Sequence, residues 1–388
     1  MKLLFATSIV PTESAGSGYE IANQAILDGL RRAGADVTVV GFAWPGRPVA
    51  DPQNTIVLGE VDVRTDTAPL PLRLRWLARA FASGRTFSSS KLREVPAERL
   101  REALQRRGSF DGVVLNSVQF AGAFEAVFAD WPSLYVAHNV EHVSALENAA
   151  ALTGYKAALF RREARLLESL EQRLCERARY VFTLSPEDLE TLRLDASRAA
   201  WLPLVTRRKA VAPLPRRPLV DAAVIGTWTW QPNLIGLDWF LDEVVSHLPG
   251  DFSVRIAGHL PTGISCPHPG VRFVGRVPDA TDFLREGRMV PLFSRAGTGV
   301  QLKTIETFEL GLPAVATSLS LRGVSKRPDN CVVSDDPRAF AEAMVHAARA
   351  GAPDLDGREF HASQRAALDI ALAKGLQMLA GSRTRIAA

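Results

Sequence analysis

The stretch Ser294–Thr317, SRAGTGVQLKTIETFELGLPAVAT, is the part of the chain that decides the fold class. A short apolar run precedes it, and two glycines, Gly297 and Gly299, lie near its beginning. Residues 300–310 then show helical periodicity, and Gly311 ends that pattern. A strand, a glycine loop and a helix in this order are typical of α/β domains, in which loop amides and the positive end of the helix can bind an anion.

Lys303 and Glu306 lie three residues apart in this predicted helix and therefore share one of its faces. Two interpretations are open. The pair can form a salt bridge on a solvated face, which contributes only ~0.2–0.5 kcal/mol and, judged on the pair alone, is the more frequent outcome. Alternatively, Lys303 binds a phosphate oxygen while Glu306 accepts hydrogen bonds from two ribose hydroxyls, because glycines let a phosphate approach the main chain closely.

The same alternation of short apolar runs and helical segments extends through both halves of the chain. We predict strands at residues 2–6, 36–42, 111–116, 132–138, 179–184, 222–226, 253–258, 271–277, 288–293, 313–318 and 331–336. We predict helices at 18–34, 155–177, 232–248 and 300–310, and from about 337 to the end. This order is typical of parallel sheets covered by helices. The predicted fold class is therefore α/β, with two Rossmann-like domains that face each other across a cleft.

The chain has 388 residues, which is more than one hydrophobic core usually holds. The segment Thr206–Leu219, TRRKAVAPLPRRPL, contains three prolines and five basic residues and has no periodicity, as is typical of a linker. We therefore predict an N-terminal domain at 1–206 and a C-terminal domain at 218–388, with the last helix crossing back to the N-terminal domain.

The net charge of +4 is unevenly distributed, and it gives no reason to expect a nucleic-acid partner. Between Arg73 and Arg107, ten basic residues accompany three acidic ones, a local balance of +7, and apolar residues such as Leu74 and Phe81 are interleaved with them. This pattern is typical of a surface that binds anionic lipid headgroups, and also of a solvated helical face. Both interpretations stay open, so peripheral membrane contact through residues 73–107 is a hypothesis.

Several features favour a cytoplasmic protein. The three cysteines are far apart and odd in number, which argues against a disulfide framework or a zinc ribbon. The chain has no run of about 18 or more uncharged apolar residues, so no membrane-spanning helix is predicted. It begins with MKLLFATSIVP, which a buried first strand explains better than a signal peptide, because no clear cleavage site follows. The predicted location is the cytoplasm, at most peripherally at the inner membrane face.

The segment GTGVQLKTIETFELGLPAVAT resembles the donor-site segment of the retaining GT-B-fold glycosyltransferases called family 4, with its G-x-G…K-x-x-E-x-x-x-x-G-x-P pattern. VIGTWTWQPNLIGLDWFLDEV resembles the first strand, loop and helix of that family's donor domain, and VRFVGRVPD resembles the strand before its nucleotide-base pocket. In the first half, YVAHNVEH and the run from Glu163 to Asp188 are similar to the acceptor domain of one bacterial branch. The resemblance covers most of the chain and is more specific in its second half.

The resemblance implies a role for each matching residue. Lys303 would neutralise the donor diphosphate, Glu306 would hold the ribose, and Arg276 and Val277 would border the base through their backbone. His138 would lie near the reacting sugar, so the implied catalytic residues are His138 and Lys303. The implied donor-binding residues are Gly16, Gly18, Gly226, Trp230, Asn233, Arg276, Val277, Gly297, Thr298, Gly299, Lys303 and Glu306. The resemblance implies no metal, and no cofactor besides the nucleotide-sugar donor.

Two positions depart from the family pattern. Family members often carry two glutamates with seven residues between them, and this chain has Thr298 at the earlier position, which usually contacts the transferred sugar. Many members also have an arginine beside the first glycine of the donor domain, where this chain has the pair Thr-Trp, so Arg295 is a candidate substitute for that cation. We expect Trp228 and Trp230 to line the cleft, and Trp239, inside a periodic helix, to lie in the core.

The function implied by the resemblance is transfer of a sugar from a nucleoside-diphosphate sugar to a glycan or lipid-linked acceptor, in polysaccharide biosynthesis, with retention of configuration. A nucleotide-sugar 2-epimerase of the same fold is an alternative, as is a non-catalytic sugar-nucleotide binder, which Thr298 keeps open. A zinc site is another, because His138, Glu141 and His142 match the H-x-x-E-H motif of zinc peptidases. That chemistry needs both histidines on one helical face, whereas an apolar strand is predicted to run into His138.

Overall fold

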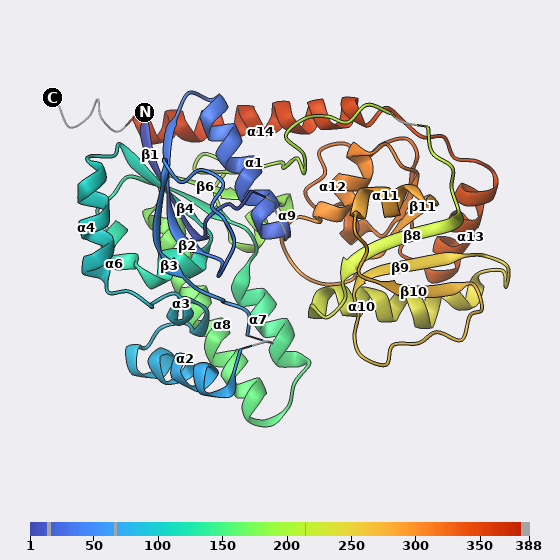
Figure 1. Cartoon of the computed structure of the whole chain (residues 1–388), viewed down its shortest axis with the longest axis horizontal. Helices are drawn as coiled ribbons and strands as arrows, with labels where there is room; N and C mark the ends of the chain where they lie inside the picture. The colour runs from blue at the N-terminus through green and yellow to red at the C-terminus, as the bar shows by residue number, and fades with distance from the viewer. Residues whose placement is uncertain (14–16, 66–67, 214, 382–388) are drawn as a thin grey trace. The chain divides into compact units, whose positions relative to one another are not determined.

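The computed structural model describes residues 1–388 except 14–16, 66–67, 214 and 382–388. The chain divides into two compact units (Figure 1). Unit 1 consists of Met1–Leu202 with Ala367–Ala388, and unit 2 of Pro203–Ala366. Each unit is built on its own parallel β-sheet. The prediction of an α/β fold with two Rossmann-like domains is therefore confirmed.

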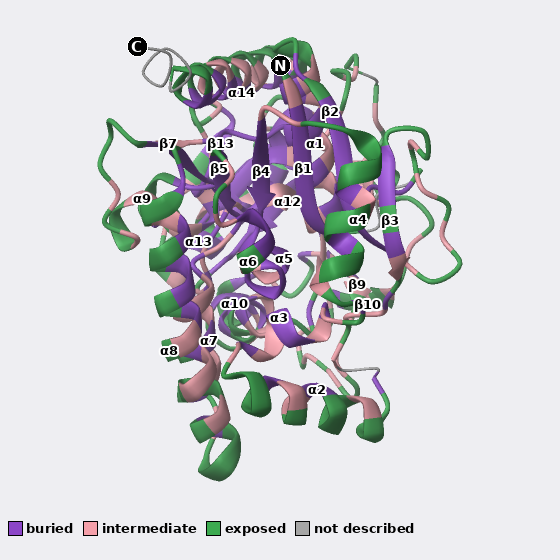
Figure 2. Cartoon of the chain, turned by 90° about the vertical axis from the view of Figure 1, so that its left-hand side faces the viewer, coloured by how far each residue is buried: buried purple, intermediate pink, exposed green. Residues whose placement is uncertain are grey.

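The sheet of unit 1 has seven parallel strands among the described residues, in the order β3-β2-β1-β4-β5-β6-β7. They are β1 (Lys2–Ile9), β2 (Asp36–Ala43), β3 (Thr55–Glu60), β4 (Gly112–Asn116), β5 (Ser133–Ala137), β6 (Tyr180–Thr183) and β7 (Ala199–Trp201). The central strands are buried on both faces (Figure 2), so they read in the sequence as continuous apolar runs. The two edge strands are not among the predicted strands, because β3 has exposed positions and β7 has only three residues.

The helices of unit 1 are α1 (Gly18–Arg32), α2 (Leu70–Ser83), α3 (Phe87–Lys91), α4 (Ala97–Arg107), α5 (Val118–Ala123), α6 (Glu125–Phe128), α7 (Glu141–Ala150), α8 (Gly154–Arg177) and α9 (Pro186–Thr191). Helix α1 begins where the Ser17 side chain accepts a hydrogen bond from the amide of Glu20, and Gly34, at φ 86°, follows its end. Helices α7 and α8 are joined by the short loop 151–153. The basic segment 73–107 is distributed over α2, α3 and α4 and is not one continuous helix.

The sheet of unit 2 has six parallel strands among the described residues, in the order β10-β9-β8-β11-β12-β13. They are β8 (Val220–Thr227), β9 (Val254–His259), β10 (Val271–Gly275), β11 (Gly287–Leu292), β12 (Ala314–Ala316) and β13 (Cys331–Val333). The helices are α10 (Gln231–Trp239), α11 (Ala280–Arg285), α12 (Leu302–Glu309) and α13 (Pro337–Arg349). The strand order reverses between β8 and β11, which is the point where open parallel sheets bind ligands at their carboxyl ends.

The helix predicted at 232–248 is not a single regular helix. Helix α10 ends at Trp239, and a π-helical turn (Phe240–Val244) and a 3-10 turn (Val245–His247) follow it. The sequence could not show this change, because Phe240 and Val244 stay buried and continue the apolar pattern. None of the described helices is both long and apolar enough to cross a membrane.

The last helix, α14 (Gly357–Ala380), begins in unit 2 and ends in unit 1. In unit 1 it lies against Gly29, where a Cβ would be only 2.4 Å from Cδ1 of Leu372. In unit 2, Gln364 donates a hydrogen bond to the carbonyl oxygen of Leu204 over 3.1 Å. The first residue of the predicted linker, Thr206, is also held within unit 2, because its amide donates to Oε1 of Glu309 over 2.9 Å.

Candidate functional site

The residues predicted to bind the donor phosphates come together in unit 2, at the carboxyl ends of the neighbouring strands β8 and β11. Gly226 lies at the end of β8, and a Cβ there would be 2.9 Å from the ring of Trp228. Gly297 and Gly299 lie in the loop between β11 and α12, with φ of 94° and 74°. Both values are in the left-handed region that favours glycine, and without a Cβ at these two positions a ligand can approach the main chain closely.

Hydroxyl groups far away in the sequence fix the position of this loop. The amide of Ser294 donates to Oγ of Ser320 over 2.8 Å, and Oγ1 of Thr317 donates to the carbonyl oxygen of Ser294 over 2.7 Å. Oγ1 of Thr304, on α12, donates to the carbonyl oxygen of Ser320 over 2.7 Å. These four residues are buried. The loop and the start of α12 are therefore held in one arrangement before any ligand arrives.

Lys303 extends from the first turn of α12 toward the first turn of α10. Its Nζ lies 3.4 Å from Oδ1 of Asn233 and 5.2 Å from the ring centroid of Trp228. Asn233 is oriented by its own donation to the carbonyl oxygen of Thr227 over 3.0 Å. Burial lowers the pKa of Lys303 to about 8, because the charged amine loses solvation. A bound anion beside this amine would stabilise its charged form and so raise its pKa again.

Glu306 does not pair with Lys303. Its carboxylate forms a salt bridge with Arg207 over 3.0 Å, and the same Nη2 of Arg207 donates to Oγ1 of Thr281 over 2.5 Å. The interpretation of Lys303 and Glu306 as a mutual salt bridge is therefore wrong. Burial raises the pKa of Glu306, and the charge of Arg207 opposes that effect. Sequence reasoning missed Arg207, because it lies in a basic, proline-rich segment without periodicity.

The predicted base-binding residues, Arg276 and Val277, lie just before the helix that contains Thr281. Arg276 is exposed and Val277 is half-buried, and both follow Gly275, the last residue of β10. Helix α11 starts four residues after Arg276, and its Thr281 is the residue bonded to Arg207. Glu306 is thus linked through Arg207 to the helix that follows the predicted base-binding pair.

The predictions for the aromatic residues have mixed outcomes. Trp228 is fully buried, stacks on Phe293 with 5.6 Å between ring centroids, and donates from Nε1 to a backbone carbonyl over 2.7 Å. The expectation that it lines a cleft is therefore wrong, because its whole ring belongs to the core. Trp230 is 45% exposed at the N-cap of α10, so it is available to a ligand. Trp239 is buried in the core as predicted.

Two arginines lie near the glycine loop. Arg295, the candidate substitute for the missing cation, pairs with Asp335 over 3.4 Å and lies 4.7 Å from the ring centroid of Trp239. Arg322, which sequence reasoning missed, is 4% exposed, and its Nη2 lies 3.8 Å from the point where a Cβ would stand on Gly297. A cation this close to the loop amides suits a phosphate. The sequence gives no signal for it, because only the folding of residues 318–321 brings Arg322 back to the loop.

In unit 1, the predicted catalytic residue His138 belongs to a buried polar network at the carboxyl ends of β1, β4 and β5. Nε2 of His138 and Oδ1 of Asn116 are 2.8 Å apart, and Nδ2 of Asn116 donates to Oδ1 of Asn23 over 2.6 Å. Nδ2 of Asn23 donates to Oγ1 of Thr7 over 3.1 Å, and the Tyr19 hydroxyl lies 2.8 Å from the same Oγ1. Burial lowers the pKa of His138 to about 3. The imidazole is therefore neutral at ordinary pH and donates its Nε2 proton to Asn116.

The glycine-loop prediction for unit 1 is only partly within the described structure. Gly18 is the exposed first residue of α1. Gly16 lies outside the described residues. The sequence signal that could have identified the network is Asn116, a polar residue that directly ends a buried strand.

The H-x-x-E-H motif does not form a zinc-peptidase arrangement. His138 follows strand β5 and contacts Asn116, whereas His142 lies in the first turn of α7. Nδ1 of His142 is 2.7 Å from a carboxylate oxygen of the buried Glu171, which raises the pKa of His142. The two histidines are therefore not on one helical face, and among the described residues no cluster of three or more His, Cys, Asp or Glu side chains could hold a metal ion.

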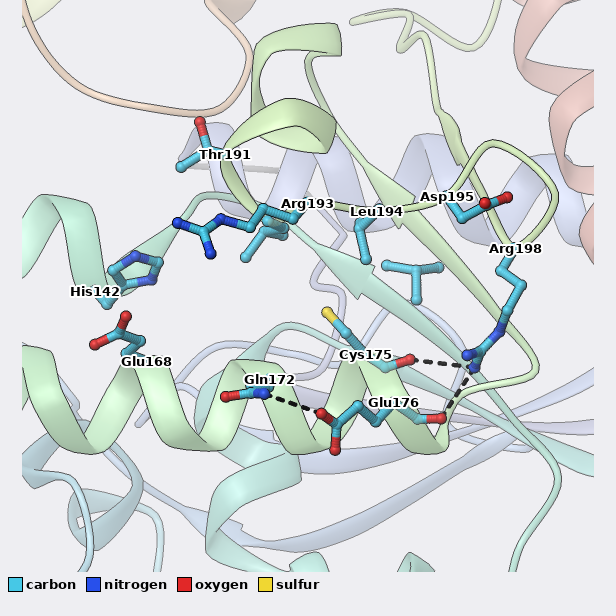
Figure 3. A pocket seen from close by; sticks show the side chains of 12 residues that line it. His142, Glu168, Gln172, Cys175, Glu176, Thr191, Arg193, Leu194, Asp195 and Arg198 are labelled. Atoms are coloured by element: carbon cyan, nitrogen blue, oxygen red, sulfur yellow. Dashed lines mark hydrogen bonds between the residues drawn. The ribbon is translucent and has the colours of Figure 1, made fainter.

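A separate pocket of 480 Å³ lies in unit 1 between α8 and the segment after α9 (Figure 3). Glu168, Gln172 and Glu176 line it from α8, opposite Arg193 and Arg198. Arg198 donates to the carbonyl oxygen of Glu176 over 2.9 Å, and Gln172 donates to its carboxylate over 3.0 Å. None of the predicted catalytic or donor-binding residues lines this pocket, whereas His142 of the H-x-x-E-H motif does.

Two family models match the chain, one in each half. "Glycosyl transferase 4-like domain" matches residues 17–205, and "Glycosyl transferases group 1" matches residues 221–349. None of the curated protein sequences compared matches this chain.

The fold is similar to those of solved glycosyltransferase structures. Sucrose-phosphate synthase from Thermosynechococcus elongatus is 16% identical with a TM-score of 0.60, and the match covers 100% of this chain and 99% of that one. WaaG, involved in lipopolysaccharide biosynthesis, is 14% identical with a TM-score of 0.57 and coverages of 98% and 100%. Anabaena HepE, solved with UDP, is 13% identical with a TM-score of 0.59 and coverages of 98% and 100%. The two family models and the shared fold show that the chain belongs to the glycosyltransferases of the GT-B fold.

Proposed function

We propose that the protein transfers a sugar from a nucleoside-diphosphate sugar to a glycan or lipid-linked acceptor, with retention of configuration and without a metal ion. The family supports sugar transfer, and HepE, one of the similar structures, was solved with UDP and with UDP-glucose. The observation that carries the donor assignment is the meeting of Lys303, Asn233 and the glycine loop at the carboxyl ends of β8 and β11.

The diphosphate would lie at this loop. As the glycosidic bond breaks, negative charge builds up on the leaving diphosphate, and preorganised donors stabilise it without having to reorganise. The groups proposed to meet this charge are the main chain around Gly297 and Gly299, the start of α12, Lys303 and Arg322. Each such donor typically contributes about 2.7–4 kcal/mol of transition-state stabilisation. This is why we propose that the reaction does not depend on a metal.

The ribose and the base would lie beside the diphosphate, about one turn further along α12. Glu306 can accept hydrogen bonds from two adjacent ribose hydroxyls, and its salt bridge with Arg207 favours the ionised form that accepts them. The backbone of Arg276 and Val277 would border the base, and the exposed Trp230 would contact the donor from the start of α10.

His138 would act on the reacting sugar as a neutral hydrogen-bonding group. Its pKa of about 3 makes it a poor carrier of protons near neutral pH. Its bond to Asn116 fixes the orientation of the ring. Gly16 and Gly18 would form the glycine loop of this domain, and Thr298 would belong to the donor site.

The wider setting is also a proposal. The resemblance favours a cytoplasmic enzyme of polysaccharide biosynthesis. A lipid-linked acceptor would require work at the inner membrane face, and the basic segment 73–107 is the part of the chain that we propose for this contact.

A thermal-shift screen with UDP, GDP and ADP tests the donor assignment, because a ligand that binds only the folded state raises the melting temperature. We expect one of the three to raise it in the wild type and to have little effect on Lys303→Ala. Product analysis with the sugar nucleotide then separates the alternatives. Conversion of donor alone to its epimer would favour the epimerase, and donor binding without release of nucleoside diphosphate in the presence of any acceptor would favour the non-catalytic binder.

A further inference from the structure

Helix α2 leaves an apolar face exposed to solvent. Leu70, Leu74, Leu77 and Phe81 follow one another at spacings of four, three and four residues, which places them on one side of the helix. Leu70, Leu74 and Phe81 are 60%, 55% and 52% exposed, whereas Trp76 on another side is buried. Helix α2 therefore packs on unit 1 through Trp76 and leaves these three side chains largely in solvent.

Helix α2 lies beside the hairpin of α7 and α8 (Figures 1 and 2). Arg162 of α8 donates to the carbonyl oxygen of Ala80 over 3.1 Å, and its guanidinium lies 4.2 Å from the ring centroid of Phe81. The first turns of α8 add two exposed aromatic residues, Tyr155 (73%) and Phe160 (36%). We define the α2–α8 surface as Leu70, Leu74, Phe81, Tyr155 and Phe160 together with the basic residues Arg73, Arg85, Lys156 and Arg161.

The charge around this surface is positive. Helix α2 contains three arginines and no acidic residue, and residues 154–162 of α8 contain three basic residues and no acidic one. The first acidic residue of α8, Glu163, accepts hydrogen bonds from the amides at the start of α3. Glu94, which lies close to α2, pairs with Arg75 and Arg79. The carboxylates of Glu94 and Glu163 are therefore engaged with groups other than the basic residues of this surface.

Arginines also converge at the end of α2. A pocket of 510 Å³ there is lined by Arg79, Arg85 and Arg93, and Glu94 is the one acidic residue among its described lining residues. Burial and the charges of Arg85 and Arg79 lower the pKa of Arg93, as expected where like charges gather. A phosphate group placed in this pocket would relieve the mutual repulsion of the arginines.

We propose that the α2–α8 surface docks the protein on a bilayer that contains anionic lipids. The leucine and aromatic side chains would enter the headgroup region, and the basic residues, with the arginine pocket, would bind lipid phosphates. This extends the proposed function, because a lipid-linked acceptor is held in such a bilayer. The proposed membrane contact then involves only the first part of the segment 73–107, together with the start of α8, which lies outside that segment.

Helix α4 is excluded from the surface, although it carries several of the basic residues in 73–107. Its Leu100 and Leu104 are buried in the core of unit 1. Its exposed charges alternate in sign, with Arg101 close to Glu98 and Arg106 close to Glu102. It therefore offers a matched control for the effect of charge alone.

Flotation with vesicles tests the proposal. The full-length protein is mixed with vesicles of phosphatidylcholine, with or without phosphatidylglycerol, at low and at high salt. We expect binding to the vesicles with phosphatidylglycerol, weakened by salt, and little binding to pure phosphatidylcholine. Equal binding to both kinds of vesicle, or no binding to either, overturns the proposal.

One double and two triple variants test whether vesicle binding depends on the α2–α8 surface. The variant Arg73→Gln, Arg85→Gln, Lys156→Gln should lose affinity about 100-fold, because each basic residue at a membrane contributes about fivefold. The variant Leu70→Ser, Leu74→Ser should lose about tenfold through lost apolar burial. The control Arg99→Gln, Arg101→Gln, Arg106→Gln on α4 should bind like the wild type, and an equal loss in this control overturns the assignment to the α2–α8 surface.

The thermal shift with the nucleoside diphosphate is measured on the same preparations. All three variants should show the same rise in melting temperature with nucleotide as the wild type, because they leave unit 2 unchanged. The same measurement shows that each variant is folded. Vesicle binding without any nucleotide shift would overturn the proposed function while supporting the docking surface. A nucleotide shift without vesicle binding would overturn the docking surface while supporting the proposed function.

Discussion

The two units have different chemistry at corresponding ends of their sheets. In unit 2, Nζ of Lys303 lies 3.4 Å from Oδ1 of Asn233 and over the ring of Trp228, and burial lowers the pKa of this lysine to about 8. In unit 1, the corresponding place holds neutral groups, and His138 and Asn116 are joined to one another by a 2.8 Å hydrogen bond. We therefore propose that unit 2 receives an anion beside its buried cation, whereas the network in unit 1 orients neutral hydroxyl and amide groups.

The largest effect is expected from Lys303→Ala. Loss of the ammonium removes one preorganised donor to the leaving diphosphate, so turnover should fall about 10²-fold or more. Steady-state kinetics with the donor identified by the screen measures this. The control is Lys326→Ala, which removes an exposed lysine from the same unit. Near-wild-type turnover of a folded Lys303→Ala variant would refute the contrast between the two units.

Arg322→Gln tests whether unit 2 has a second cation. A hydrogen bond between charged groups contributes about 1.5–3 kcal/mol, so we expect donor affinity or turnover to fall by about 10- to 100-fold. Arg295→Gln is the matched control, because Arg295 is held by Asp335 and Trp239. A larger loss in Arg295→Gln than in Arg322→Gln would show that Arg295, and not Arg322, is the second cation.

In unit 1, Asn116→Ala should change stability rather than donor binding. It leaves buried groups of His138 and Asn23 without the amide that joins them, which costs about 1–3 kcal/mol of the free energy of unfolding. Urea denaturation measures that free energy, and the thermal shift with nucleotide should stay the same size. A loss of the nucleotide shift in a folded Asn116→Ala variant would contradict the division of roles.

The pH dependence of donor binding should be the smallest of these effects. Burial lowers the pKa of Lys303 from 10.5 to about 8, so the free protein loses the ammonium as the pH rises above that value. Because the diphosphate binds the charged form, affinity should fall about tenfold one pH unit above it. Calorimetric titration across this range measures the change. Lys303→Arg should show no such fall, since arginine stays protonated, and a fall of equal size in that variant would assign the effect to another group.

Much of the fold follows from local patterns. The buried central strands β1, β4 and β5 appear as continuous apolar runs, and glycines with positive φ, such as Gly34 after α1, end helices where the sequence predicts. The edge strands β3 and β7 could not be found this way, because a strand that is short or partly exposed has no long apolar run. The π-helical turn after α10 was also missed, since the apolar pattern does not change there.

For the candidate site as well, local patterns predict some features, and only the tertiary structure shows the others. The sequence by itself determined that Gly297, Gly299, Lys303 and Glu306 lie in a loop and the helix behind it, because glycine conformation and helical spacing act over a few residues. Only the tertiary structure decided their partners. Lys303 contacts a residue 70 positions away and Glu306 one 99 positions away, and Arg322 reaches the loop through a separate turn. Such pairs depend on which strands are neighbours and in what register they pair, and no local pattern in the chain encodes that.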